Sequence, residues 1–186
     1  MATVRDRADR IGPDRVPTGA GAAQIRVTQA ALFRHFPTKA ALWQAVAEHV
    51  AEGLETAWEE ALRLGDTPIV RLRALISAQF AQIAATPALP MLLFSRELNV
   101  TNAKLRATFH GRLTTFHGLL AMEGGAGQNT GALRGDIAAN DAAALLTSLV
   151  QGVAIRWALG ARDFNLREEG LRLFDVQCRL LAVRGE

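Results

Sequence analysis

The chain of 186 residues contains one cysteine, no tyrosine and few aromatic residues, which make up 6% of the sequence. The single cysteine, Cys178, excludes an internal disulfide and is typical of a protein kept in a reducing compartment. The N-terminus is charged rather than signal-like, and we expect that no stretch approaches a membrane span. These features together predict a cytoplasmic protein.

The motifs of the common catalytic and metal chemistries are also missing. The sequence has no Ser-His-Asp order and no HExxH, GxSxG or paired-carboxylate motif, so we do not expect an enzyme and predict no catalytic residues. His110 and His117 lie two turns apart on one predicted helix face, but with only a distant Cys178 they make a poor zinc set. We predict no metal site and no cofactor.

The sequence is rich in Ala and Leu and has little strand patterning, which predicts an all-α fold. Apolar spacing, capping residues and Gly or Pro stops predict helices over 2–11, 19–25, from 28 or 29 to about 35, and over about 39–64, 68–85 and 90–98. Three further helices are predicted from 101 or 102 to about 122, from 140 or 141 to about 160, and from 166 to about 183. The glycine-rich segment 123–136 lacks an apolar period and is predicted to be a mobile loop. A phosphate-binding loop is disfavoured there, because no strand precedes it and no GK[ST] occurs.

Positive charge is concentrated at the N-terminal end of the chain. Residues 1–39 contain seven cations and three anions, whereas the remainder contains 14 cations and 15 anions. A positive end on a near-neutral body is what attraction to phosphate requires. A few arginines that merely solvate a small surface would give the same count, so the charge alone leaves both interpretations open.

The segment 27–42, with the sequence VTQAALFRHFPTKAAL, predicts a short helix, a stop and a restart. Pro37 disfavours helical geometry at Phe36, and the Thr38 hydroxyl can cap the helix that follows. Ala31 and Leu32 would face a core together with Phe36. A short helix that leaves Gln, a small residue, an aromatic and cations exposed suits a DNA major groove better than a catalytic pocket.

The run from Val27 to Lys39 closely resembles the recognition helix and the entry to helix four of TetR-type transcriptional regulators. The features it shares are the Val-Thr turn, Leu followed by Phe, His-Phe, and a Lys two residues after the Pro. The resemblance implies an all-α protein with a helix-turn-helix DNA-binding domain at 1–45. It also implies a helical effector-binding and dimerisation domain at 46–186.

The resemblance assigns DNA contacts to residues of this run. Gln29 can pair with adenine and Ala30 can meet a thymine methyl, while Arg34 faces the same way and would contact backbone or base. The residues expected to hold phosphates are Thr28, Phe33, His35 and Lys39. An ordinary surface helix is the alternative interpretation.

Two positions depart from the family pattern. Gly21 stands where a core aliphatic residue is usual, and Arg26 stands where the turn usually has Gly. A glycine inside a helix costs about 1 kcal/mol relative to Ala. Together with the short first helix, 2–11, these departures motivate an alternative function, in which the chain is a helical effector-binding or interaction module whose DNA-binding head is weakened or non-functional.

The family places a ligand cavity in the helical body, where this chain offers aromatic residues and two histidines. An apolar lining with few polar groups suits a small hydrophobic effector. Aromatics at helical spacing are also ordinary core residues, so both interpretations stay open. The predicted lining residues are Phe80, Met91, Phe94, Phe109, His110, Phe116, His117 and Trp157.

The last two predicted helices, about 141–160 and 166–183, are apolar over a broad arc, and surplus apolar surface favours a partner. In TetR-like proteins these helices form a four-helix dimer interface, so the resemblance implies a homodimer. It further implies a repressor that binds double-stranded DNA at a near-palindromic operator and leaves the DNA when its effector binds. An intramolecular core is the alternative explanation of the same pattern.

Overall fold

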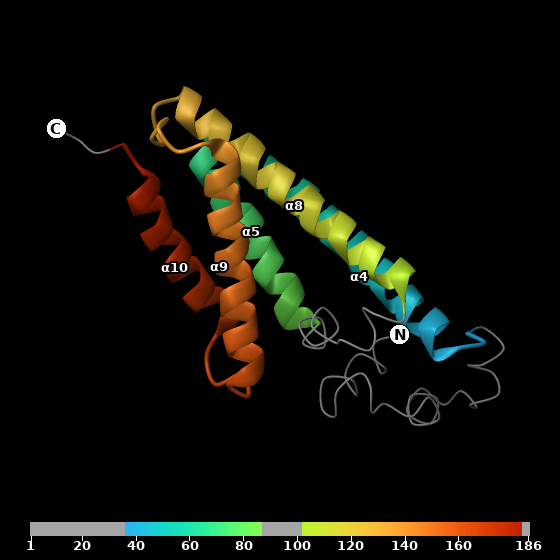
Figure 1. The fold of residues 1–186 in the computed structure, drawn as a ribbon. Helices are drawn as coiled ribbons and strands as arrows, with labels where there is room; N and C mark the ends of the chain where they lie inside the picture. The colour runs from blue at the N-terminus through green and yellow to red at the C-terminus, as the bar shows by residue number, and fades with distance from the viewer. Residues whose placement is uncertain (1–35, 87–101, 184–186) are drawn as a thin grey trace. The chain divides into compact units, whose positions relative to one another are not determined.

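The computed structural model describes residues 36–86 and 102–183 of the chain. Contacts divide the chain into two compact units, residues 1–52 with 85–111 and residues 53–84 with 112–186. The described helices are α4 (Lys39–Arg63), α5 (Pro68–Ala85), α8 (Ala103–Asn129), α9 (Ala139–Leu159) and α10 (Leu166–Leu181) (Figure 1). The predicted all-α fold is confirmed, and α4 and α8 each contribute residues to both units. The predicted functional boundary at residue 45 stays a prediction.

In the first unit, the described residues are chiefly the beginnings of α4 and α8. Phe36 to Thr38 are not helical, and α4 starts at Lys39 with the Thr38 hydroxyl accepting a hydrogen bond from the Ala41 amide at 3.0 Å. Asn102 plays the same part for α8, since its Oδ1 accepts from the Leu105 amide at 3.0 Å. The buried apolar residues of this part are Leu42, Trp43, Val46, Ala47, Val50, Ala51, Leu105 and Phe109.

In the second unit, the core forms around two large rings of α4 and α8. Trp58 stacks on Phe116 with ring centroids 5.2 Å apart, and its indole N–H donates to Gln79 Oε1 at 2.9 Å. The α5 helix starts at Pro68 with its buried residues on one face, and the Val70 amide donates to the Thr67 hydroxyl at 3.4 Å. The buried α5 residues are Leu72, Leu75, Ile76, Phe80 and Ile83.

The glycine-rich segment 123–136 corrects the sequence-based prediction of a mobile loop. Helix α8 does not end near Met122 but continues to Asn129. Gly127 receives the buried side chain of Leu133 so closely that a Cβ at Gly127 would lie 2.9 Å from Leu133 Cδ1. The Ala132 and Leu133 amides both donate to the Gly127 carbonyl, which folds the chain back over the helix end. Gly127 therefore allows close packing of Leu133, and the glycines inside α8 do not break the helix.

Helices α9 and α10 lie side by side (Figure 1). Gly160 ends α9 as predicted, and Ala161 and Arg162 follow with φ of 54° and 64°. Asn165 begins α10, with its side chain accepting from the amides of Arg167 and Glu168 at 3.1 and 3.2 Å. The predicted start of the last helix is therefore confirmed.

By length and composition alone, α9 is long and apolar enough to cross a membrane. The expectation that no stretch approaches a membrane span was wrong for this helix. Its buried residues include Leu146, Val150, Val153 and Trp157, which pack inside the second unit. A core helix of a globular protein passes the same test of composition.

Cys178 lies partly buried on α10. Burial, together with the nearby carboxylate of Asp175, raises the pKa of its thiol to about 11. The thiol is therefore protonated at neutral pH.

Candidate functional site

The predicted DNA-contact segment leads directly into the start of α4. Lys39 is the first residue of this helix and follows the Thr38 cap. The other residues predicted to contact DNA lie outside the described part of the chain, and their roles stay predictions. They are Thr28, Gln29, Ala30, Phe33, Arg34 and His35.

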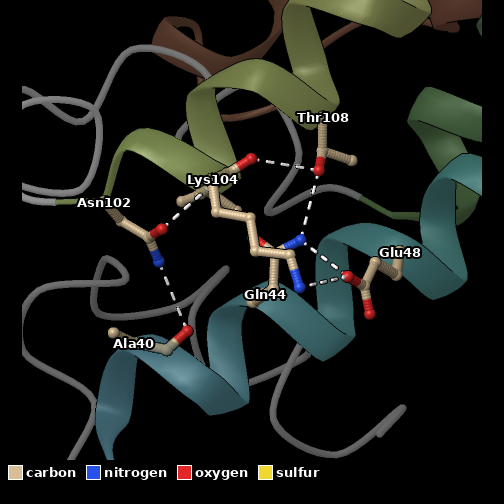
Figure 2. A network of polar contacts seen from close by, with 7 residues as sticks. Ala40, Gln44, Glu48, Asn102, Lys104 and Thr108 are labelled. Atoms are coloured by element: carbon tan, nitrogen blue, oxygen red, sulfur yellow. Dashed lines mark hydrogen bonds and ion pairs between the residues drawn. The ribbon is translucent and has the colours of Figure 1, made fainter.

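A network of polar contacts joins the first turns of α4 to the first turns of α8 (Figure 2). We call this network the α4–α8 clamp, and it consists of Ala40, Gln44 and Glu48 of α4 with Asn102, Lys104 and Thr108. The residue that caps α8 also holds α4, because the Asn102 amide nitrogen donates to the Ala40 carbonyl at 3.3 Å. One side chain thus fixes the beginnings of two helices.

Gln44 is the buried centre of the clamp, with 7% of the residue exposed. Its amide nitrogen donates to Glu48 Oε1 at 2.8 Å and to the Thr108 hydroxyl at 3.2 Å. The Thr108 hydroxyl in turn donates to the Lys104 carbonyl at 3.1 Å, and Lys104 Nζ lies 3.5 Å from Glu48 Oε1. The contacts close a ring across the two helices.

The clamp holds Glu48 as a carboxylate. The hydrogen bond from Gln44, supported by the charge of Lys104, lowers the pKa of the Glu48 carboxyl below its ordinary value. The buried amide nitrogen can therefore donate to a charged acceptor, which makes a stronger hydrogen bond than a neutral one does.

Two buried polar atoms beside the clamp have no hydrogen-bond partner within the described part of the chain. They are the Nε1 atom of Trp43 and the Oε1 atom of Gln44. Sequence reasoning did not single out Gln44, because a glutamine on a helix reads as a surface residue. The available signal was its place beside Trp43 and on the helix face of Ala47 and Ala51, three and seven residues further on, which are all buried.

The structure places the predicted effector residues in different surroundings. Of those in the second unit, Phe80, Phe116 and Trp157 are buried and His117 is half-buried. Trp157 is held by a hydrogen bond from its indole N–H to the Phe164 carbonyl at 3.1 Å. Phe109 is buried and His110 exposed in the first unit, and Met91 and Phe94 lie outside the described residues. Their role in effector binding stays a prediction.

A family model described as BetI-type transcriptional repressor, C-terminal, matches residues 68–177, which is more than half of the chain. The chain belongs to the TetR family of transcriptional regulators. Relatives of this TetR-family chain are themselves described as regulators rather than as enzymes.

This TetR-family chain is 32% identical over 95 residues to the nucleoid occlusion factor SlmA of Vibrio campbellii. The aligned residues make up 51% of this chain and 48% of that protein. The chain spans about half the length of the curated relatives it matches. A regulator from Saccharomonospora viridis in complex with choline matches with a TM-score of 0.82 at 22% identity, covering 98% of this chain and 95% of that one. The regulator AibR, in complex with isovaleryl coenzyme A and operator DNA, matches with a TM-score of 0.74 at 18% identity over 97% and 95%.

A groove of about 470 Å³ runs over the second unit of the TetR-family chain, between the end of α4, α5 and the start of α10. None of the predicted effector residues that the structure describes lines it. Its floor is built from alanines one turn apart, such as Ala57 with Ala61 and Ala74 with Ala78. Alanine at helical spacing carries no chemical signature, so the sequence could not have indicated this groove.

Proposed function

We propose that the chain is a homodimeric, cytoplasmic DNA-binding repressor that a small hydrophobic effector releases from a near-palindromic operator. The observation that carries this proposal is that one chain contains both a repressor-family domain and a segment that resembles a DNA-recognition helix. A match to a repressor family over residues 68–177 follows a segment that resembles a recognition helix and leads into the capped start of α4.

The DNA-binding part of the proposal assigns base contacts to Gln29 and Ala30 and phosphate contacts to Lys39. Lys39 stands at the first position of α4, where the unpaired amides of a helix N-terminus also favour a phosphate. Two such heads would reach successive major grooves about 34–36 Å apart, which requires a dimer and an inverted repeat.

Exposed apolar side chains of α9 and α10 support the proposed dimer. Leu145 and Leu159 of α9 are 48% and 79% exposed, and Leu180 near the end of α10 is 62% exposed. Leu145, Leu149 and Gly152 recur at one-turn spacing, and Gly152 has open space where a side chain would stand. A partner that covers this face would bury apolar surface that the described chain leaves in water.

The proposed effector is a small molecule with a hydrophobic part. The regulators described above in complex with choline and with isovaleryl coenzyme A have the same fold, and this supports a ligand-responsive body in this chain. The effector would act by binding one of two head spacings more tightly than the other, which shifts their populations. We propose that the predicted aromatic residues of the body supply its apolar contacts.

Selection of bound duplexes from random DNA tests the proposed function, and we expect enrichment of an inverted repeat. Lys39→Ala should then weaken binding to the selected and to unrelated sequences alike, and should reduce the slope of log affinity against log salt by about 1. Arg63→Ala is the matched control, because Arg63 is an exposed cation at the far end of the same helix. A Lys39→Ala slope equal to that of the wild type would contradict the phosphate contact.

The alternative function, an effector-binding module with a weakened head, predicts a different pair of results. Such a module would enrich no DNA sequence, yet small hydrophobic molecules would still raise its thermal stability by mass action. Enrichment of an inverted repeat would exclude this alternative.

A further inference from the structure

We infer that Gln44 is a positioning residue for DNA recognition, whose buried amide holds the first turns of α4 in one orientation against α8. This inference rests on the proposed function, since a position of α4 matters to DNA only if the segment before it reads DNA. The evidence is the geometry of the α4–α8 clamp.

The clamp holds α4 at two points one turn apart on the same helix face. Asn102 holds the Ala40 carbonyl at 3.3 Å, and Thr108 accepts from the Gln44 amide at 3.2 Å. A single contact would leave α4 free to pivot, whereas two contacts separated by a turn restrict both its rotation and its sliding. The second contact is made by a side chain that α4 alone supplies, so it can be removed without altering α8.

The contacts of the clamp with Glu48 and Lys104 keep the Gln44 amide in this orientation. Because the Gln44 amide nitrogen donates to a Glu48 carboxylate that also faces Lys104, the nitrogen rather than the oxygen of the amide points at Thr108. A turned amide would bring its oxygen against the carboxylate. The charge of Glu48 therefore selects the donor arrangement.

The clamp also has a built-in opposing cost. The amide oxygen of Gln44 and the indole nitrogen of Trp43 are buried and have no hydrogen-bond partner among the described residues, and each offsets part of the stability that the hydrogen bonds contribute. The net stability that the clamp contributes to this orientation of α4 is therefore small. Loss of the Gln44 amide would release the orientation while leaving the apolar contacts of Leu42, Val46 and Leu105 in place.

The orientation of α4 affects the position of the predicted recognition helix, because the two are joined by a few residues of chain. The predicted recognition helix, 28–35, lies only a few residues before Ala40 in the chain, so we infer that the orientation of the first turn of α4 constrains where this helix can lie. In a dimer, both heads must meet grooves of fixed spacing, and a spread of α4 orientations lowers the fraction of molecules that match.

Gln44→Met tests the inference, because Met preserves the length of the side chain and removes both hydrogen bonds and the unpaired oxygen. Neither former partner of Gln44 loses all its contacts. Glu48 still forms its ion pair with Lys104, and the Thr108 hydroxyl still donates to the Lys104 carbonyl. Gln82→Met on α5 is the matched control, a half-buried glutamine in the second unit. Hydrogen exchange of the amides of residues 39–52, thermal unfolding and affinity for the selected operator are measured on the full chain.

We expect exchange over residues 39–52 to become several-fold faster in Gln44→Met, with the melting temperature close to that of the wild type. Operator affinity should fall by about tenfold, the loss that one or two hydrogen bonds of ordinary strength represent. A merely structural role would lower the melting temperature and leave the affinity of the folded fraction unchanged. Gln82→Met should alter neither exchange in α4 nor affinity.

Unchanged exchange over 39–52, or faster exchange with full operator affinity, would overturn the inference. Should Gln44→Met unfold the chain, Lys104→Ala replaces it, because the Lys104 side chain is 76% exposed and its loss cannot open the core. Its effect should have the same direction and be smaller, and no effect would also overturn the inference. Failure of the wild-type chain to select any DNA would count against the proposed function, and the exchange measurement would still decide whether Gln44 holds α4.

Discussion

Gly170 of α10 lies directly against the ring of Phe80 on α5. A Cβ at residue 170 would stand 2.5 Å from the Cδ2 and Cζ atoms of this ring and closer still to Cε2. Phe80 is fully buried, so its ring cannot turn out into solvent to make room for an added side chain. The absence of a side chain at one position of α10 therefore allows α5 and α10 to pack in contact.

We predict that Gly170→Ala destabilises the fold by about 1–3 kcal/mol, the usual cost of extra volume in a packed core. Chemical denaturation measures the change in the free energy of unfolding. Gly118→Ala in α8 is the control, because no atom lies within 4 Å of where its Cβ would stand. This control should be stabilised by up to about 1 kcal/mol through helix propensity. Equal destabilisation of both variants would show that packing against Phe80 is not the cause.

The ion pair between Arg71 and Glu123 gives a second prediction. Arg71 Nε donates to Glu123 Oε2 at 2.8 Å, and the Glu123 side chain is only 6% exposed. Arg71→Met would leave a buried carboxylate without its cation and should cost about 3 kcal/mol. Adding Glu123→Leu should restore most of this loss, because the pair is then replaced by apolar groups.

The exposed pair of Arg73 and Asp175 serves as the control for that experiment, since both of its side chains are nearly half exposed. Arg73→Met should change the free energy of unfolding by less than about 1 kcal/mol. If the two arginine variants lose equal stability, the burial of Glu123 does not determine the cost.

Glu169 gives a prediction about pH. Hydrogen bonds from Arg172 and then Arg156 lower the pKa of its carboxyl from the ordinary 4.5 to about 2. A carboxyl with a lowered pKa in the folded state stabilises the fold above its unfolded pKa, and this stabilisation is lost as the pH falls through the folded value. The wild type should therefore lose its advantage over Glu169→Gln between about pH 4.5 and pH 2. Unfolding curves across this range, or NMR titration of the carboxyl, measure the effect, and a titration near 4.5 would contradict it.

The proposed dimer face predicts the oligomeric state of two leucine variants. Leu145→Glu places a charge among the exposed apolar residues of α9 and should yield monomers at micromolar concentration. Leu64→Glu changes a more exposed leucine near the end of α4, at 78% exposure, and should leave the dimer intact. Light scattering after size-exclusion chromatography measures the mass. Dimers of Leu145→Glu would place the interface elsewhere.

Local chemistry explains the features that the sequence predicted well. Thr38, Thr67, Asn102 and Asn165 each cap a helix that the sequence predicted, because a capping side chain acts on amides two or three residues away. The recognition-like segment could be identified for the same reason, since its pattern is continuous in sequence.

Contacts between distant residues explain what the sequence could not predict. Gln44 and Thr108 are 64 residues apart, and neither residue alone indicates that an amide and a hydroxyl meet. The continuation of α8 to Asn129 depends on Leu133 packing on Gly127, a tertiary contact that outweighs the poor helix propensity of glycine. The sequence pattern of a single segment indicates its helix propensity, but it cannot show that a contact with a distant residue outweighs that propensity.

The single cysteine has a practical consequence for experiments on this chain. Alkylating reagents attack the thiolate, and the raised pKa of Cys178 keeps that form scarce at neutral pH. A second cysteine placed on an exposed turn of α4 will ionise far more readily and take up a fluorophore or spin label first. Site-specific spectroscopy of α4 can therefore begin with the native Cys178 left in place.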